Sequence, residues 1–149
     1  MRAVHVKKYD SIENIQIDEV ATPSISEGEV LVKVQAASIG FVDGLKVQGL
    51  YQTKDPLPFT PGTEFAGVVA EVAENVAGNV KALARGTRVM GLAPNGGLAE
   101  YVAAHTSDLH PMPEGVSYEV GAALGTNYPT ALYALQARAS LQPGECLLV

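Results

Sequence analysis

One carboxylate stands where a buried strand is expected to begin. Residues 59–69 read FTPGTEFAGVV, so a Pro-Gly turn leads into an apolar run and Glu64 lies at the junction. A carboxylate at the buried start of a strand needs a charged or hydrogen-bonding partner. That partner can be a metal ion, a ligand or the backbone, and the residues alone leave these three possibilities open.

Other side chains that could bind a metal ion are few and widely spaced. Cys146 is the only cysteine, which excludes an internal disulfide and any site built from several thiolates. His5, His105 and His110 lie in a predicted strand and a loop, without the spacing of partner ligands, so we expect surface or loop histidines. The single cysteine also favours a cytoplasmic protein.

The composition indicates a soluble globular protein with its own core. The chain has 149 residues, of which 47% are hydrophobic and 17% charged, as expected for a folded domain. The net charge is −6 and Lys and Arg form no cluster, which argues against nucleic acid and anionic membranes as partners. No apolar run reaches the roughly 20 residues of a membrane span, and the N-terminal segment lacks the apolar region of a signal peptide.

Short strands separated by turns are predicted over most of the chain. In residues 28–38, Val30, Val32 and Val34 fall on one face of a strand with a period of two. The other segments with a strand pattern are 4–6, 66–74, 87–93 and 96–104. Turns rich in Gly and Pro separate these segments, which favours a β-barrel or a sandwich.

The period of the apolar residues changes near residue 117. Ser117 can cap a short helix, with Glu119 in its first turn. Residues 127–141 then carry apolar residues at helical spacing, with Pro129 near the start. The apolar segment 146–149 is predicted to be a strand. It either closes the barrel or, as we favour, begins a second, doubly wound domain that is cut after its first strand.

Five segments, in the same order along the chain, carry a resemblance to a known family. They are residues 30–72, 86–102, 109–124, 130–135 and 141–149. The sequence resembles the amino-terminal half of the medium-chain dehydrogenase/reductase superfamily, in particular its zinc-independent quinone oxidoreductase branch. The resemblance implies a mainly β (α+β) fold. A GroES-like β-barrel, the substrate and catalytic domain, would span residues 1–125, and the first helix and strand of a truncated Rossmann domain would span residues 126–149.

The resemblance also implies that no metal ion is bound. Zinc-dependent members of the superfamily place a Cys and a His at the positions that read Gly40 and Thr63 here, and neither residue is a usual zinc ligand. Glu64 is therefore expected to accept backbone N–H bonds or to pair with an arginine, rather than to form a polar wall of the nicotinamide pocket. Asp43 is expected to stabilise a local cap or turn near the short helix that follows Gly40.

NADPH is the cofactor that the resemblance implies, with a small-molecule quinone or enone as the substrate and a homodimer as the assembly. Tyr51 matches the family tyrosine that lines the substrate cleft, and its phenol is predicted to be the catalytic donor to the carbonyl oxygen. Thr130, Asn127 and Phe41 are predicted to bind the cofactor, with Thr130 at the position that bonds the nicotinamide carboxamide. Two alternatives stay open: Tyr51 as a surface aromatic, and Thr130 bonding to its own helix.

Three departures from the family pattern bear on function. Gly40 replaces the family asparagine before the short helix, Thr87 replaces an aspartate before Arg88, and residues 73–86 form a longer segment than expected. The change at Gly40 supports an alternative function, that of a non-catalytic GroES-like binding or adaptor module. A stand-alone interaction domain is a third possibility, and it requires a chain end that closes the barrel.

Overall fold

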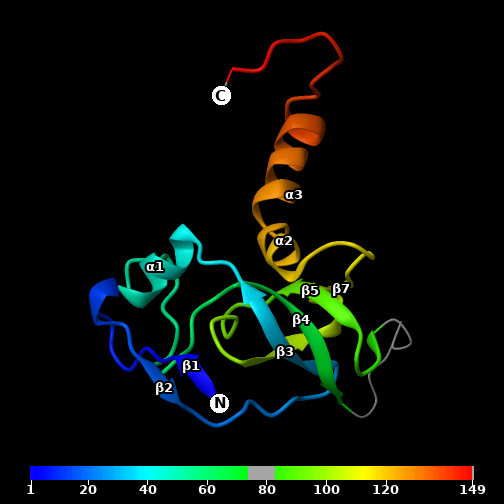
Figure 1. Ribbon diagram of the computed structural model, residues 1–149. Helices are drawn as coiled ribbons and strands as arrows, with labels where there is room; N and C mark the ends of the chain where they lie inside the picture. The colour runs from blue at the N-terminus through cyan, green and yellow to red at the C-terminus, as the bar shows by residue number, and fades with distance from the viewer. Residues whose placement is uncertain (74–82, 149) are drawn as a thin grey trace.

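A five-stranded antiparallel sheet forms the centre of the computed structural model, which describes residues 1–73 and 83–148 (Figure 1). Its strands run in the spatial order β6-β3-β4-β5-β7. Their bounds are β3 Glu29–Ala37, β4 Glu64–Val72, β5 Arg88–Leu92, β6 Tyr101–His105 and β7 Leu109–Pro111. A smaller sheet pairs β1 (Arg2–Val4) with β2 (Ile17–Glu19). The mainly β fold predicted from the sequence is confirmed.

The alternation of apolar and polar residues in β3 follows the two faces of the sheet. Val30 and Val32 are buried on one face, whereas Lys33 on the other face is exposed; Leu31, which shares the face of Lys33, is buried as well. Val32 lies opposite Val69 of β4 on one side and Val102 of β6 on the other, so three strands bring their valines to the same core. The buried members of this core are Val30, Val32, Phe65, Val69, Leu83, Val89, Ala93, Val102, Ala104 and Leu109.

A glycine allows β3 and β4 to approach at one point of irregular pairing. The register between the two strands shifts twice, once near Val34, which lies opposite Gly67. A Cβ at Gly67 would lie 2.2 Å from the carbonyl oxygen of Lys33, which leaves no room for any side chain. The close contact between these strands therefore depends on glycine at this position.

The helices lie at one end of the sheet or extend from it. α1 spans Phe41–Val47, α2 spans Tyr118–Ala123 and α3 spans Asn127–Leu132, with short 3₁₀ turns η1 (Ile12–Asn14) and η3 (Thr106–Asp108). The predicted start of α2 is confirmed, because the Ser117 hydroxyl accepts a hydrogen bond from the Val120 N–H. α2 packs closely on β4, since a Cβ at Gly121 would lie 3.3 Å from Ala66 Cβ.

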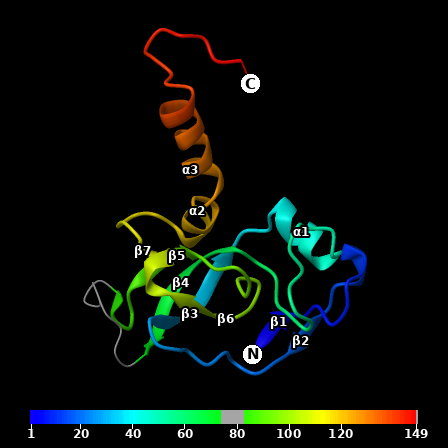
Figure 2. The same cartoon turned by 180° about the vertical axis from the view of Figure 1, so that it is seen from behind.

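The predicted helix in residues 127–141 is confirmed in a modified form. α3 continues into the π-helical segment Tyr133–Arg138, and together they extend away from the sheet (Figures 1 and 2). Nearly all side chains of this segment are exposed, including Leu132 and Tyr133. Their apolar character therefore does not reflect burial within the described part of the chain.

The strand predicted for residues 146–149 is not formed in the described part of this segment, residues 146–148. A strand needs a hydrogen-bonding neighbour, and every described strand pairs elsewhere. Leu148 is 96% exposed, and the segment that follows the α3 helix lies apart from the sheet (Figure 1), so the alternative in which residues 146–148 close the barrel is wrong. Most of the predicted longer segment 73–86 lies outside the described residues.

The described helices, those in residues 1–73 and 83–148, include none with the length and hydropathy needed to cross a membrane.

Candidate functional site

Glu64 meets a hydroxyl and a backbone amide at the start of β4. Its side chain is 7% exposed. Oε2 accepts a hydrogen bond from the Ser38 hydroxyl at 2.8 Å, and Oε1 accepts one from the Thr126 N–H at 2.7 Å. The expectation that Glu64 accepts a backbone N–H bond is confirmed, and no arginine pairs with it among the described residues.

Asp43 also binds backbone amides on two sides. It is the third residue of α1 and is 3% exposed. Oδ2 accepts from the Gly40 N–H at 2.8 Å, which is the local cap expected from the sequence. Oδ1 accepts from the Gly62 N–H at 3.0 Å, a long-range contact that the sequence did not indicate. Asp43 therefore ties the start of α1 to the turn that precedes β4.

Tyr51 and Phe41 flank α1 at its two ends. Phe41 begins the helix and is 83% exposed, so its ring is available to a ligand or another surface. Tyr51 is half-buried in the loop that follows α1, and its hydroxyl oxygen accepts a long hydrogen bond of 3.4 Å from the amide of Gln52. Within the described residues the Tyr51 hydroxyl makes no shorter hydrogen bond, so it can donate to a ligand.

Thr130 and Asn127 lie on the same side of α3, because residues three apart are neighbours on a helix. The Thr130 hydroxyl donates to the Thr126 carbonyl at 2.6 Å, which confirms the interpretation that it bonds to its own helix. The hydroxyl oxygen nevertheless keeps lone pairs that can accept a second hydrogen bond. The side chain of Asn127 is exposed at the first position of the helix.

The predicted site residues thus fall into two groups on separate elements. Tyr51 and Phe41 belong to α1 and its following loop, and Asn127 and Thr130 belong to α3. Both elements stand on the same side of the sheet in the two views, with the chain after β3 leading to α1 and the α2–α3 pair next to it (Figures 1 and 2). No hydrogen bond joins the two groups within residues 1–73 and 83–148.

A buried ionic network, which the sequence did not indicate, holds the loop that carries Tyr51. Lys46 is 6% exposed, and its ammonium group donates to the Pro94 carbonyl at 2.6 Å and to Asn95 Oδ1 at 2.7 Å. The same ammonium lies 3.3 Å from Asp55 Oδ2, and the Asn95 amide donates to Asp55 Oδ1 at 2.6 Å. Lys46 and Asp55 lie on either side of Tyr51 in sequence, so their pairing restrains the loop between them.

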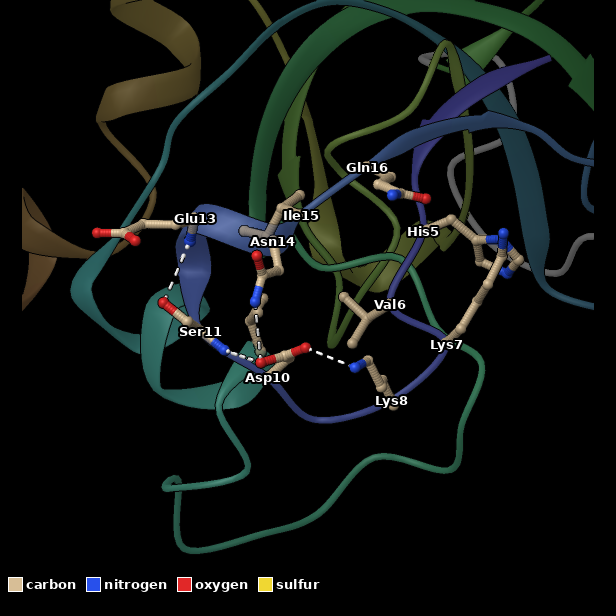
Figure 3. Close-up of a pocket in the computed structure, with 11 residues that line it drawn as sticks. His5, Val6, Lys7, Lys8, Asp10, Ser11, Glu13, Asn14, Ile15 and Gln16 are labelled. Carbon is tan, nitrogen blue, oxygen red and sulfur yellow. Dashed lines mark hydrogen bonds and ion pairs between the residues drawn. The ribbon is translucent and has the colours of Figure 1, made fainter.

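A hollow of about 490 Å³ lies elsewhere, between residues 5–16 and Val47 (Figure 3). Its polar side chains bind one another, since Asp10 accepts from Lys8 at 2.8 Å and from Asn14 at 3.1 Å. The hydrogen bond from Lys8 is the main cause that lowers the pKa of Asp10 to about 2. None of the four predicted site residues lines this hollow, and its pairing leaves few groups for a ligand.

The described residues offer no metal site. Gly40 precedes α1 and Thr63 precedes Glu64, so neither position carries a nitrogen or sulfur ligand. In the part of the chain that the structure describes, no three His, Cys, Asp or Glu side chains gather closely enough to hold a metal ion.

The residues present suit one end of a nicotinamide cofactor. An exposed amide at Asn127 and a hydroxyl with free lone pairs at Thr130 match the donors and acceptors of a carboxamide. The pyrophosphate end would need a turn of the form G-x-G-x-x-G, and these 149 residues contain no such spacing of glycines.

The chain matches a known family and known proteins over most of its length. Residues 26–114 match the family described as "Alcohol dehydrogenase GroES-like domain". The chain is 43% identical over 135 residues to quinone oxidoreductase-like protein 2 of Rattus norvegicus, covering 91% of this chain and 37% of the relative. It is 36% identical over 151 residues to the quinone oxidoreductase of Homo sapiens, covering all of this chain and 45% of the relative. The chain therefore spans less than half the length of these relatives.

The chain also matches solved structures of oxidoreductases over most of its length. The quinone oxidoreductase of Thermus thermophilus, which was also solved in complex with NADPH, matches with a TM-score of 0.79 and 36% identity over 97% of this chain and 43% of that one. A probable oxidoreductase from Mycobacterium abscessus matches with a TM-score of 0.87 and 35% identity over 97% of this chain and 45% of that one. The chain belongs to the medium-chain dehydrogenase/reductase superfamily, in its quinone oxidoreductase branch, and corresponds to the amino-terminal, GroES-like half of these proteins.

Proposed function

We propose that this chain is the substrate-side part of an NADPH-dependent oxidoreductase that reduces a quinone or enone without zinc and works as a homodimer. The observation that carries the proposal is the 36% identity, over 97% of the chain, to the Thermus thermophilus quinone oxidoreductase that was solved with NADPH. Residues 1–125 form the GroES-like domain in this proposal, and residues 126–149 begin the nucleotide-binding domain.

In this proposal, the chain's residues stabilise the charge that develops on the substrate. NADPH, when bound, supplies a hydride, which brings the two electrons that reduce a conjugated carbonyl. When a conjugated carbonyl compound is reduced, negative charge develops on its carbonyl oxygen. Tyr51 donates a hydrogen bond to this oxygen, and its half-buried phenol passes a proton from bulk water to it. The exposed apolar side chains of Ile39 and Phe41 help to keep water away from the reacting atoms.

Two residues of α3 bind the nicotinamide end in this proposal. The Thr130 hydroxyl donates to the Thr126 carbonyl and accepts from the carboxamide N–H, so both of its hydrogen-bonding functions are used. Asn127 supplies an amide on the same side of the helix. These two contacts orient the carboxamide, while the affinity for NADPH comes mainly from phosphate contacts that these residues do not make.

We expect the purified protein to contain no bound zinc. Gly40 and Thr63 leave Glu64 as the one carboxylate at the family's metal position, and a catalytic zinc site needs about three protein ligands. Elemental analysis of the purified protein after dialysis against zinc-free buffer measures the content of bound metal. A stoichiometric amount of zinc, near one ion per chain, would contradict the proposal.

We expect NADPH to bind the 149-residue chain weakly, in the millimolar range, and without turnover of a simple quinone. The reason is that Thr130 and Asn127 contact one end of the cofactor, while no glycine-rich turn within these residues binds its pyrophosphate. Titration of NADPH into ¹⁵N-labelled protein should shift the amide resonances of Phe41, Asn127 and Thr130 in the NMR spectrum.

The control for this titration is Thr130→Val, which keeps the shape of the side chain and removes the hydroxyl. We expect this variant to lose most of the shift at Asn127 while its other resonances stay unchanged. Shifts confined to other regions would contradict the assigned cofactor residues. The absence of any shift would favour a non-catalytic binding module, which is the function that Gly40 in place of the family asparagine also supports.

A further inference from the structure

Glu64 forms two hydrogen bonds with Ser38, in addition to its bond to the start of α3. Its own carbonyl accepts the Ser38 N–H at 3.1 Å, and its carboxylate accepts the Ser38 hydroxyl at 2.8 Å. The end of β3 therefore fixes both the backbone and the side chain of Glu64. Because the side chain is also buried, Oε1, the carboxylate oxygen that does not bind Ser38, has a defined position relative to the barrel.

Glu64 Oε1 replaces a missing part of the α3 cap. In a capping box, the third residue of a helix reaches back to accept the backbone N–H of the N-cap residue. The N-cap of α3 is Thr126, and the third residue is Pro129, which has no side-chain acceptor. Glu64, 62 residues earlier, accepts the Thr126 N–H at 2.7 Å instead. The barrel thus supplies the acceptor that the helix lacks, through a charge-assisted hydrogen bond.

The backbone before Thr126 runs directly along this carboxylate. A Cβ at Gly125 would lie 3.2 Å from Glu64 Oε1 and 2.9 Å from Leu92 Cδ2. A side chain at this position would press on the carboxylate and displace the end of the flexible Leu92 side chain, so glycine eases the close approach that brings the Thr126 N–H to Glu64. The carboxylate and the chain between α2 and α3 therefore fit together at this point.

Beyond Thr126, the structure shows little else that directs α3. The side chains from Asn127 to Ala134 are exposed, and α3 leads away from the sheet (Figure 2). A helix whose side chains make few contacts takes its direction from the way in which its first turn is attached. Within residues 1–73 and 83–148, the bond to Glu64 is the one hydrogen bond that joins a barrel side chain to the start of α3.

We propose that Glu64 is a positioning residue that fixes the direction of α3 relative to the barrel. Through α3 it sets where Asn127 and Thr130 stand with respect to Tyr51, a consequence that rests on the function proposed above. The carboxylate itself touches neither substrate nor cofactor in this role.

The test measures the orientation of α3 in the 149-residue chain by NMR, without any cofactor. Residual dipolar couplings of amides in α3 are compared with those in β3 and β4, and hydrogen exchange is measured at the Thr126 amide. In Glu64→Ala, we expect exchange at Thr126 to become about tenfold faster or more, as for the loss of a hydrogen bond to a charged acceptor. The couplings of α3 should fall toward zero while those of β3 keep their pattern.

Two further variants separate positioning from a loss of folding. Glu64→Asp keeps the charge but withdraws the carboxylate by about one carbon–carbon bond, roughly 1.5 Å, so it should also release α3 while the barrel stays folded. Glu64→Gln keeps an oxygen for the Thr126 N–H and an amide for the Ser38 hydroxyl, so it should restore the wild-type couplings.

The proposal is overturned if α3 keeps its wild-type orientation in Glu64→Asp, or if Glu64→Gln releases α3 as fully as Glu64→Ala. The outcome of this orientation test does not depend on the outcome of the NADPH titration. If Glu64→Ala and Glu64→Asp release α3 but NADPH shifts no resonances of the wild-type chain, the proposed function is contradicted and the positioning role stands. An unchanged orientation with a successful titration would contradict the positioning role alone.

Discussion

Replacing Tyr51 by phenylalanine is expected to lower kcat/KM for quinone reduction by roughly ten- to a thousandfold, the range seen when one donor to a developing oxyanion is lost. The substitution removes only the hydroxyl, whose hydrogen bond within the described structure is the long one from Gln52. Because that bond is weak, folding should be little affected. The measurement needs a protein in which these 149 residues are joined to a nucleotide-binding domain, with NADPH and a simple quinone as substrates.

Tyr101→Phe is the matched control for this prediction. Tyr101 lies in β6, where it pairs with Lys33 of β3, and it belongs to neither group of predicted site residues, so the same loss of a phenol oxygen there should leave kcat/KM unchanged. An equal and small effect at both positions would place Tyr51 among the surface aromatics, the alternative that the sequence left open. A rise in KM with an unchanged kcat would mean that Tyr51 binds the substrate without assisting the reaction.

The second large effect is expected on stability. Lys46→Ala should lower the free energy of unfolding by about 3–5 kcal/mol, as when one partner of a buried ion pair is removed. The substitution leaves the Asp55 carboxylate without its cation and deprives Pro94 and Asn95 of a donor. It also removes a buried alkyl chain. Urea unfolding followed by circular dichroism measures the change.

Lys7→Ala provides the matched control, since it also removes a lysine from an ion pair. Lys7 lies 2.7 Å from Asp18, but its side chain is 60% exposed, whereas that of Lys46 is 6% exposed. Surface pairs contribute little to stability because water screens them. The Lys7 variant should therefore unfold almost as the wild type does. Similar decreases in the free energy of unfolding of the two variants would show that the buried Lys46–Asp55 pair stabilises the protein no more than a surface pair does.

Features that depend on close neighbours in sequence could be predicted. The alternating valines of β3 and the Ser117 cap of α2 each involve residues only a few positions apart, so the local pattern determines them. The need of Glu64 for a hydrogen-bonding partner also followed from its place before a buried strand. The identity of that partner did not, because Thr126 is 62 residues away and its amide carries no signal in the sequence.

Lys46 shows why the rest of the site could not be predicted. A lysine in the last turn of a short helix reads as an ordinary exposed cation near the helix C-terminus. Its burial is decided by Asp55 and Asn95, which come from two loops that the fold brings together. The predicted strand is absent from the described residues 146–148 for a related reason, since apolar composition favours a strand only where a neighbouring strand is present.

The strand order has a consequence for how the protein is made on the ribosome. β3 lies between β4, the next strand along the described chain, and β6, whose first residue Tyr101 is synthesised 64 residues after Ala37. At the roughly 5–20 residues per second of translation, one edge of β3 therefore waits several seconds for its partner. During that time the nascent chain presents a valine-rich strand with open hydrogen-bonding groups, so folding competes with capture by chaperones and with pairing between neighbouring nascent chains.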